Sequence, residues 1–424
     1  MKQFFLFFLA FLLVAPATGQ ELKRKENASG KWGFIDVHGN TMIPFLYDYV
    51  GAFSEGLASV QLNGKYGFID KQGNMVIPCK YDNSGYFSEG LASVQLNGKY
   101  GCIDKQGNMV IPCKYYAIWP FQDGLARVIL KGKRGFIDKY GKEVIPCKYD
   151  NVWQHYDGVA MVELNGKRGF VDKQGNTVIP CKCDGAHYFR EGLAAVILNG
   201  KWGFIDPQGN VAIPCQYDYA GYFFEGLAAV QLNGKYGFID KQGNTAIPFL
   251  YDKANSFREG LARVKLNGKY GFIDKQGNTA IPCKYDYVYD FNKDIVEVIL
   301  NDKHGYIDRQ GNTVVPCLYE EIEDFYGGFA KVSLNGKWGY VDAQGNAAIP
   351  CQYDYAWYFL EGLAAVQLNG KYGFIDKQGN TAIPFIYDWA YPFDNGLARV
   401  QLNGKEGYIN SRGDWFDTKY DGQK

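Results

Sequence analysis

The chain has 424 residues, more than one compact core usually organises, so a single ordinary domain is not expected. Its 45 Lys and Arg residues balance 45 Asp and Glu residues, which argues against a protein that binds the phosphate backbone of a nucleic acid. Aromatic residues make up 17% of the chain, which excludes the composition of a disordered protein, and ten cysteines are too few for a disulfide-stapled mini-domain.

The first segment of the chain is typical of a secretory signal peptide. Lys2 precedes an apolar run from Phe4 to Val14, and mostly small residues follow up to Gly19. A helix of this apolar run would rise about 16 Å, too little to cross the ~30 Å core of a bilayer. We therefore predict a cleaved signal peptide at residues 1–19, with an uncleaved interfacial anchor as the alternative. The mature protein is expected in the periplasm, at the cell surface or outside the cell, with no transmembrane segment after signal removal.

A repeat of 34 residues fills the rest of the chain. A Gly that precedes a Phe-Ile-Asp element recurs twelve times from Gly33 to Gly407, always at an interval of 34 residues. We assign residues 29–409 to the repeats, 20–28 to an N-terminal polar cap or linker, and 410–424 to a degenerate C-terminal cap. Polar or degenerate ends are expected where an array of repeats must stop exposing new edges.

The first half of one repeat predicts a β-hairpin. Apolar and polar residues alternate over residues 57–62, which indicates a half-buried strand. Asn63-Gly64 favours a two-residue type I′ turn, because both central residues of this turn need positive φ. Residues 65–70, rich in aromatic and β-branched side chains, predict the second strand.

The second half of the repeat predicts another turn and a strand at an edge. The segment from Asp70 to Gly73 favours a turn with Gly in the left-handed conformation. Residues 76–81 predict the third strand, and Pro78 places it at an edge because proline has no N–H to donate. Residues 82–90 are expected to connect to the next repeat.

Each repeat is thus predicted to be a three-stranded antiparallel meander, which is marginal alone and must bury its apolar face against its neighbours. The predicted fold class is all-β, a tandem array of about twelve 34-residue three-stranded β-meander repeats. An open or superhelical solenoid is the preferred arrangement, and a closed propeller-like ring is the alternative.

Three copies carry a Lys-Trp-Gly element followed by two apolar residues and Asp, at residues 31–36, 201–206 and 337–342. Together with the later Ile-Pro, Tyr-Asp and Phe-x-Glu-Gly-Leu-Ala elements, they resemble the bacterial WG repeat, also called the KWG repeat. Most copies have Tyr in place of Trp, so the indole is not expected to be required in each copy. The resemblance implies a β-rich bacterial repeat array, often exported, with no general activity attached.

Recurring carboxylates predict scaffolding rather than catalysis. Equivalents of Asp70, Asp82 and Glu89 occur in most copies, whereas a catalytic carboxylate pair is needed once. The turn that begins at Asp70 also offers too few oxygens for a calcium site. The four histidines occupy four different repeat positions, so none is expected to share a ligand. We therefore predict no enzyme, no catalytic residue, no cofactor and no metal site.

Eight of the ten cysteines share one repeat position, directly after Ile-Pro. Three other copies have Phe there, so the position favours apolar packing and we expect buried thiols. Disulfides between neighbouring repeats are the alternative in an exported protein, and they require Cα atoms within about 7 Å. The eight residues are Cys79, Cys113, Cys147, Cys181, Cys215, Cys283, Cys317 and Cys351.

Four residues between Tyr-Asp and the recurrent Phe change from copy to copy, and we call them the variable segment. Their Trp and Tyr side chains offer a large contact area with a polar tip. We hypothesise that they form a recognition strip, although rings that cover the contacts between repeats are the alternative. The candidate ligand-binding residues are Tyr49, Tyr86, Trp119, Trp153, Tyr188, Tyr222, Tyr289, Trp357, Trp389 and Tyr391.

These features predict an exported non-enzymatic repeat scaffold that mediates protein or cell-envelope interactions through its variable aromatic segments. A glycan- or cell-wall-binding module is the alternative. The expected partner is a protein or a cell-wall glycan, and no nucleic acid.

Overall fold

A computed structural model describes residues 22–156 and 158–417, and side chains are described for all of these except 154–156. The predicted signal peptide at 1–19 lies outside the described residues. Within them every regular element is a β-strand. The chain divides between Val211 and Ala212 into two units, and each unit is described by itself. In the part of the chain covered by the structure, there is no helix with the length and apolarity needed to cross a membrane.

Before the division the strands follow one another at short intervals. They are β1 (Lys23–Glu26), β2 (Trp32–Ile35), β3 (Thr41–Tyr47), β4 (Tyr49–Val50), β5 (Leu57–Leu62), β6 (Lys65–Asp70), β7 (Met75–Tyr81), β8 (Asn83–Ser88), β9 (Leu91–Leu96), β10 (Lys99–Asp104), β11 (Met109–Tyr115), β12 (Ala117–Ile118), β13 (Leu125–Leu130), β14 (Lys133–Asp138), β15 (Glu143–Tyr149), β16 (Asn151–Tyr156), β17 (Val159–Leu164), β18 (Lys167–Asp172), β19 (Thr177–Cys183), β20 (Gly185–Ala186), β21 (Ala194–Leu198) and β22 (Lys201–Ile205).

From the division onward the same order continues. The strands are β23 (Val211–Tyr217), β24 (Tyr219–Phe224), β25 (Leu227–Leu232), β26 (Lys235–Ile239), β27 (Thr245–Tyr251), β28 (Lys253–Ala254), β29 (Leu261–Leu266), β30 (Lys269–Asp274), β31 (Thr279–Tyr285), β32 (Tyr287–Val288), β33 (Ile295–Leu300), β34 (Lys303–Asp308), β35 (Thr313–Tyr319), β36 (Glu321–Ile322), β37 (Phe329–Leu334), β38 (Lys337–Asp342), β39 (Ala347–Tyr353), β40 (Tyr355–Ala356), β41 (Leu363–Leu368), β42 (Lys371–Asp376), β43 (Thr381–Tyr387), β44 (Trp389–Ala390), β45 (Leu397–Leu402), β46 (Lys405–Asn410) and β47 (Trp415–Phe416).

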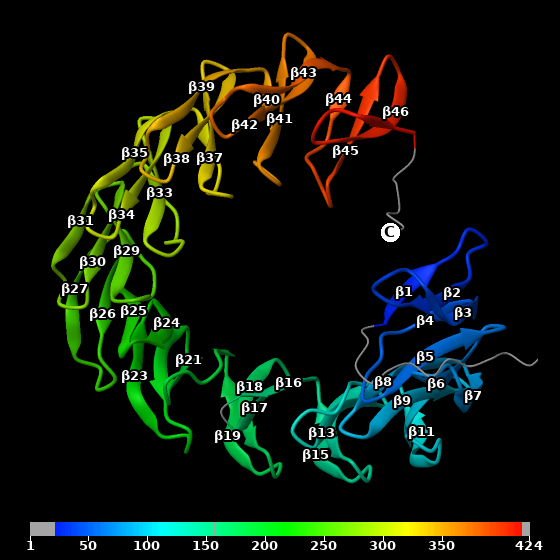
Figure 1. Ribbon diagram of the computed structural model, residues 1–424. Helices are drawn as coiled ribbons and strands as arrows, with labels where there is room; N and C mark the ends of the chain where they lie inside the picture. Colours follow the sequence, from blue (N-terminus) through cyan, green and yellow to red (C-terminus); the bar gives the residue numbers. More distant parts are fainter. Residues whose placement is uncertain (1–21, 157, 418–424) are drawn as a thin grey trace, which may run out of the picture. The chain divides into compact units, whose positions relative to one another are not determined.

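Each repeat forms one antiparallel sheet, and Figure 1 shows the strands of each sheet side by side. In the sheet β4-β5-β6-β7, the last three strands are the predicted meander. β4 adds a fourth strand, because Tyr49 and Val50 pair with Gln61 and Val60 of β5. The all-β class and the tandem, solenoid-like array of 34-residue repeats are therefore confirmed. The connection between meanders differs from the prediction, since part of it is extended and joins the sheet.

The turns and the edge strand follow the sequence pattern. Asn63 and Gly64 have φ of 51° and 75°, which confirms the type I′ turn. Gly73 has φ of 84° and donates to the carbonyl of Asp70 at 3.0 Å, which confirms the second turn. Pro78 lies in β7, which pairs only with β6 in its sheet, so the edge position is also confirmed.

The hydrophobic core lies between consecutive sheets, at an interface that we call a joint. At one joint, Phe68, Ile77 and Tyr81 of one sheet pack against residues of the next sheet, and all of these side chains are buried. The partners from the next sheet are Phe87, Ala92, Val94 and Ile103. The same arrangement recurs at other joints of both units. A single sheet therefore supplies only part of each core to which it contributes.

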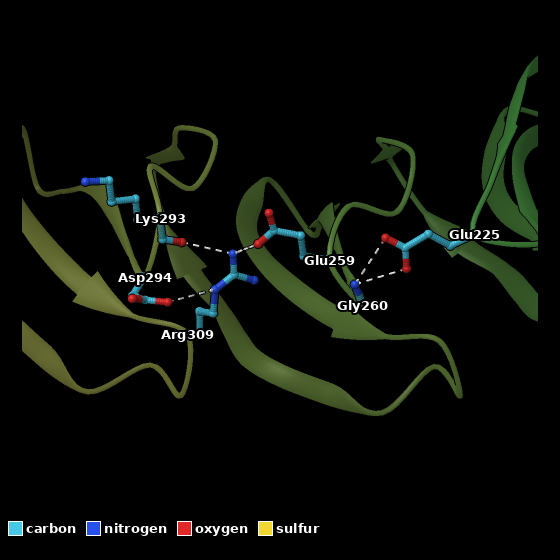
Figure 2. A network of polar contacts seen from close by, with 6 residues as sticks. All are labelled: Glu225, Glu259, Gly260, Lys293, Asp294 and Arg309. Carbon is cyan, nitrogen blue, oxygen red and sulfur yellow. Dashed lines mark hydrogen bonds and ion pairs between the residues drawn. The ribbon is translucent and has the colours of Figure 1, made fainter.

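Polar contacts also join neighbouring repeats, and Figure 2 shows one such network in the second unit. A carboxylate oxygen of Glu225 accepts a hydrogen bond from the backbone N–H of Gly260 in the next repeat, at 3.1 Å. Arg309 forms an ion pair with Glu259 of the preceding repeat and donates to the carbonyl oxygen of Lys293 at 2.9 Å. Its Nε lies 3.7 Å from the carboxylate of Asp294. These contacts orient one repeat against the next.

The ends of the described chain differ from the middle. The first sheet has three strands, and all four side chains of its edge strand β1 are exposed. The last sheet ends in β47, which has two residues where other repeats have a seven-residue strand such as β7. The proposed role of both ends as caps stays a prediction.

Candidate functional site

The variable segments lie at the joints. In Tyr49-Val50-Gly51-Ala52, the second residue is buried in the core. The third residue, Gly51, donates its N–H to the carbonyl of Ser59 on β5 at 2.8 Å. We call the third residue and the residue eight positions later the joint pair, because they lie opposite each other.

The ten predicted candidate residues differ in exposure. Tyr49, Tyr86, Trp119, Tyr289 and Tyr391 are exposed, with Tyr86 at 55% the most accessible of them. The other candidates are half-buried, namely Trp153, Tyr188, Tyr222, Trp357 and Trp389. Some rings pack on their own sheet, as Tyr49 does against Tyr66 of β6, with ring centres 6.3 Å apart. The alternative of rings that cover the contacts between repeats stays a prediction.

The structure brings three of the candidates together in the second unit. The rings of Trp357 and Tyr391 lie 5.9 Å apart, and those of Tyr391 and Trp389 lie 4.9 Å apart. Tyr355 extends the row, at 5.5 Å from Trp357. Four aromatic rings from two consecutive variable segments thus form a continuous row.

Variable segments of consecutive repeats line shared cavities. A cavity of about 490 Å³, the Ser59 groove, is lined by Tyr49, Gly51, Ser59 and Tyr66 from one repeat and by Ser84 and Tyr86 from the next. The next repeat carries a cavity of about 560 Å³, the Ser93 groove, which is lined by Gly85, Ser93, Tyr100, Ile118 and Trp119, among others.

A third cavity of about 440 Å³ lies in the second unit, where Gly221 and Ala229 form the joint pair. In these three cavities, the joint pair is Gly with Ser or Ala. A further cavity of about 550 Å³ is lined by the larger joint pair Tyr289 and Glu297, so a small pair is one of the ways in which a joint is open.

Other joints are filled by a cation of the chain itself. Arg127 is the later member of its joint pair, and its guanidinium lies 4.0 Å from the centre of the Trp119 ring and donates to the carbonyl of Val152 at 3.3 Å. Arg263 donates in the equivalent way to the carbonyl of Val288 at 2.6 Å.

Lys331, whose side chain is only 5% exposed, donates to the carbonyl of Ala356 at 3.1 Å and pairs with Glu323 at 2.9 Å. The sequence analysis did not identify these cations as part of the candidate site. A signal for three of the cavities is present in the sequence, because each has a joint pair of Gly with Ser or Ala.

The recurring carboxylates are used in structural contacts. Asp82 accepts from Lys65 Nζ at 2.6 Å and from the backbone N–H of Asn97 at 2.8 Å, and the bond with Lys65 lowers the pKa of its carboxyl. Glu89 accepts from the N–H of Gly124 at 2.9 Å and pairs with Lys139 at 3.2 Å. Among the described residues, no group of three or more His, Cys, Asp or Glu is placed to hold a metal ion.

Comparison with protein families decides the identity of the repeats. The family described as WG containing repeat matches residues 32–66, 66–100, 100–133, 135–167, 169–202, 202–236, 236–270, 270–303, 305–338, 338–372 and 372–405. The chain belongs to the WG repeat family. No curated protein matches the sequence.

Solved structures show only distant likeness to this WG repeat chain. A eukaryotic initiation factor is 11% identical, with a TM-score of 0.30, over 78% of this chain and 95% of that one. The extracellular domain of a one-component system from B. thetaiotaomicron is 9% identical, with a TM-score of 0.23, over 96% and 78%. PorZ, a surface component of the type-IX secretion system of Porphyromonas gingivalis, is 11% identical, with a TM-score of 0.24, over 88% and 59%.

The cysteines of the WG repeats are free thiols. All ten are free, and the eight at the shared position are half-buried, whereas Cys102 and Cys183 are buried. The expectation of buried thiols is therefore corrected at the shared position, because an edge strand such as β7 leaves it partly open to solvent. Burial raises the pKa of the Cys147 thiol to about 11 and that of Cys102 to about 12.

We expect these thiols to make the protein less stable in alkali. The folded state holds the proton of the Cys102 thiol more tightly than the unfolded chain does. The stability that this protonated thiol contributes is therefore complete below about pH 9 and is lost as the pH rises towards about 12. The melting temperature at pH 10.5 should therefore lie below that at pH 8. A Cys102→Phe variant carries the residue that most copies have at this position, and its melting temperature should fall less between pH 8 and pH 10.5. An equal fall in both proteins would show that ionisation of Cys102 does not cause the loss of stability.

Proposed function

We propose that this WG repeat chain is an exported, non-enzymatic scaffold that binds a partner in the grooves between its repeats. The observation that carries the proposal is that variable segments of consecutive repeats line the same cavities. The recurrent residues build the frame, as the contacts of Asp82 and Glu89 illustrate. A recognition surface needs residues that vary at the binding groove and a scaffold of recurrent residues that holds them in place.

The proposed partner is a protein of the cell envelope. Trp and Tyr side chains are enriched at protein interfaces, where their rings are buried and their polar atoms keep a hydrogen bond. The exposed rings of Tyr86 and Trp119 meet this description, because each lines an open groove. Export is proposed from residues 1–19, whose basic start and short apolar run are typical of a signal peptide.

A cell-wall glycan is the second candidate partner. The row of rings formed by Tyr355, Trp357, Tyr391 and Trp389 favours it, because the apolar faces of sugar rings pack against aromatic rings. This row lies in the second unit, away from the Ser59 and Ser93 grooves in sequence.

Replacement of aromatic rings in the variable segments should abolish partner capture. A variant with Ala at Tyr86, Trp119, Trp357 and Tyr391 should no longer retain the proteins that the unchanged chain captures from an envelope extract. Retention on purified cell-wall glycan is measured in parallel, and a loss confined to the glycan arm identifies the second candidate. The matched control is Tyr140→Ala, since Tyr140 is 86% exposed but lies on a turn outside the variable segments. Equal retention by both variants would reject the binding function of the segments.

A further inference from the structure

The open and filled joints are versions of one site. Ser59 and Ser84 line the Ser59 groove, and their equivalents two repeats later are Arg127 and Val152. There the guanidinium of Arg127 crosses the joint to the carbonyl of Val152. We propose that the Ser59 and Ser93 grooves bind the guanidinium groups of arginine side chains from the partner. The proposal rests on the proposed function and names the chemistry that the grooves recognise.

Both grooves carry aromatic rings suited to a cation. Tyr49, Tyr66 and Tyr86 line the Ser59 groove, and Tyr100 and Trp119 line the Ser93 groove. A guanidinium over an aromatic face gains cation–π attraction of about 0.5–1 kcal/mol at exposed sites and more when water is excluded. The chain itself uses this contact, since Arg127 lies 4.0 Å from the Trp119 ring centre.

Ser84 lines both grooves and stands at the position whose backbone carbonyl accepts from a cation in the filled joints. Its backbone carbonyl is therefore the acceptor that we expect an incoming guanidinium to use. The Ser84 Oγ is buried in the joint, and we assign it no contact with the ligand. The position of Ser84 corresponds to the residues whose carbonyls accept from Arg127 and Arg263.

The charges around the grooves permit a cation. None of the residues that line the two grooves is Asp, Glu, Lys or Arg. The Arg127 guanidinium already lies on the Trp119 ring of the Ser93 groove, so we expect the Ser59 groove to be the stronger of the two sites. The groove at Ala229 has the same small joint pair but is also lined by Arg258, Arg263 and Arg309. These cations oppose a further positive charge, so the Ala229 groove is not included in the proposal.

Arginine fits better than lysine. A guanidinium is planar, so it can lie flat on a ring while its N–H groups reach the plane of a carbonyl or hydroxyl oxygen. It is also less strongly hydrated than an ammonium group, which lowers the cost of entering a half-closed groove. Burial lowers the pKa of the Arg127 guanidinium, which reports this cost in the filled joint.

The proposal is tested by titrating the full mature chain with an oligo-arginine peptide and following the heat of binding. The same peptide with citrulline in place of arginine keeps the shape and removes the charge, and it should bind at least about tenfold more weakly. A Ser59→Met, Ser93→Met variant fills both grooves without changing the charge and should weaken binding by a similar factor. Methionine occurs at the equivalent position in another repeat, where Met161 is only 4% exposed, so the fold accommodates it. Ser59→Ala, Ser93→Ala is the matched control and should bind like the unchanged chain.

Equal binding of the arginine and citrulline peptides would overturn the proposal, as would equal binding by the Met and Ala variants. These results are separable from a failure of the proposed function. If ring replacement abolishes envelope capture while the unchanged chain does not bind oligo-arginine, the scaffold function stands and the arginine assignment falls. If the peptide binds as expected while envelope capture does not depend on the rings, the arginine assignment stands and the proposed function falls.

Discussion

A fragment of one repeat, residues 49–81, is expected to be unfolded in water, whereas a fragment of four repeats, residues 49–183, is expected to fold. The single sheet β4-β5-β6-β7 contains Phe68, Ile77 and Tyr81, but their buried contacts include side chains of the next sheet. Without that sheet these apolar side chains face water, and the loss of conformational entropy on folding is not offset. Hydrogen exchange of backbone amides measures the difference.

The four-repeat fragment is the matched control because it contains complete sheets and the joints between them. Its interior sheets, β8 to β15, pack against a neighbour on both sides and should show protected amides. Its terminal sheets should exchange faster, since each lacks one neighbour. Protected amides in the single-repeat fragment would show that one sheet is stable alone. The inference that each core forms only where two sheets pack together would then be wrong.

The sequence predicts the parts of this fold that depend on local chemistry. Asn63-Gly64 predicts its turn because few residues adopt positive φ at both positions, and the structure has φ of 51° and 75° there. Pro78 predicts an edge strand because it lacks an N–H, and β7 lies at the edge of its sheet. Such signals need no knowledge of distant residues.

Features that depend on contacts across strands were predicted incompletely. β4 has two residues, too few for an alternation of polar and apolar side chains to identify, and it exists because it pairs with β5. The shared cysteine position accepts Cys or Phe, which predicts an apolar site, but the sequence does not show that an edge strand leaves it half-open.

The candidate site shows the same limit. Variation and aromatic content identify the variable segments, and the structure places them along the grooves. The joint pair was missed, because its two members lie eight residues apart and become neighbours only through the pairing of their strands, as Trp119 and Arg127 do.

Substitution of Gly101 by Ala is expected to destabilise its sheet by about 3 kcal/mol, the upper end of the cost of overpacking. Gly101 lies on β10, opposite a register shift in the pairing with β11. A Cβ atom there would lie 2.3 Å from the carbonyl oxygen of Ile111 and 2.7 Å from the backbone nitrogen of Cys113. Both atoms belong to the backbone, so the strand itself would have to move. A Cβ atom at the equivalent Gly of most other copies would make the same close approach to backbone atoms, for example at Gly67 and Gly135.

Gly98→Ala is the control that separates this clash from the loss of a glycine as such. Gly98 has φ of 73° in the neighbouring turn, and a Cβ atom there would meet nothing within 4 Å. The cost of Gly98→Ala is therefore only the left-handed backbone conformation, about 1–2 kcal/mol. Because unfolding of a repeat array need not be two-state, exchange of the β10 and β11 amides is the suitable measurement. A cost of about 3 kcal/mol should accelerate their exchange on the order of 100-fold. If Gly101→Ala accelerates exchange less than Gly98→Ala does, β11 can move aside at little cost, and the close backbone contact is not the reason that glycine is required at position 101.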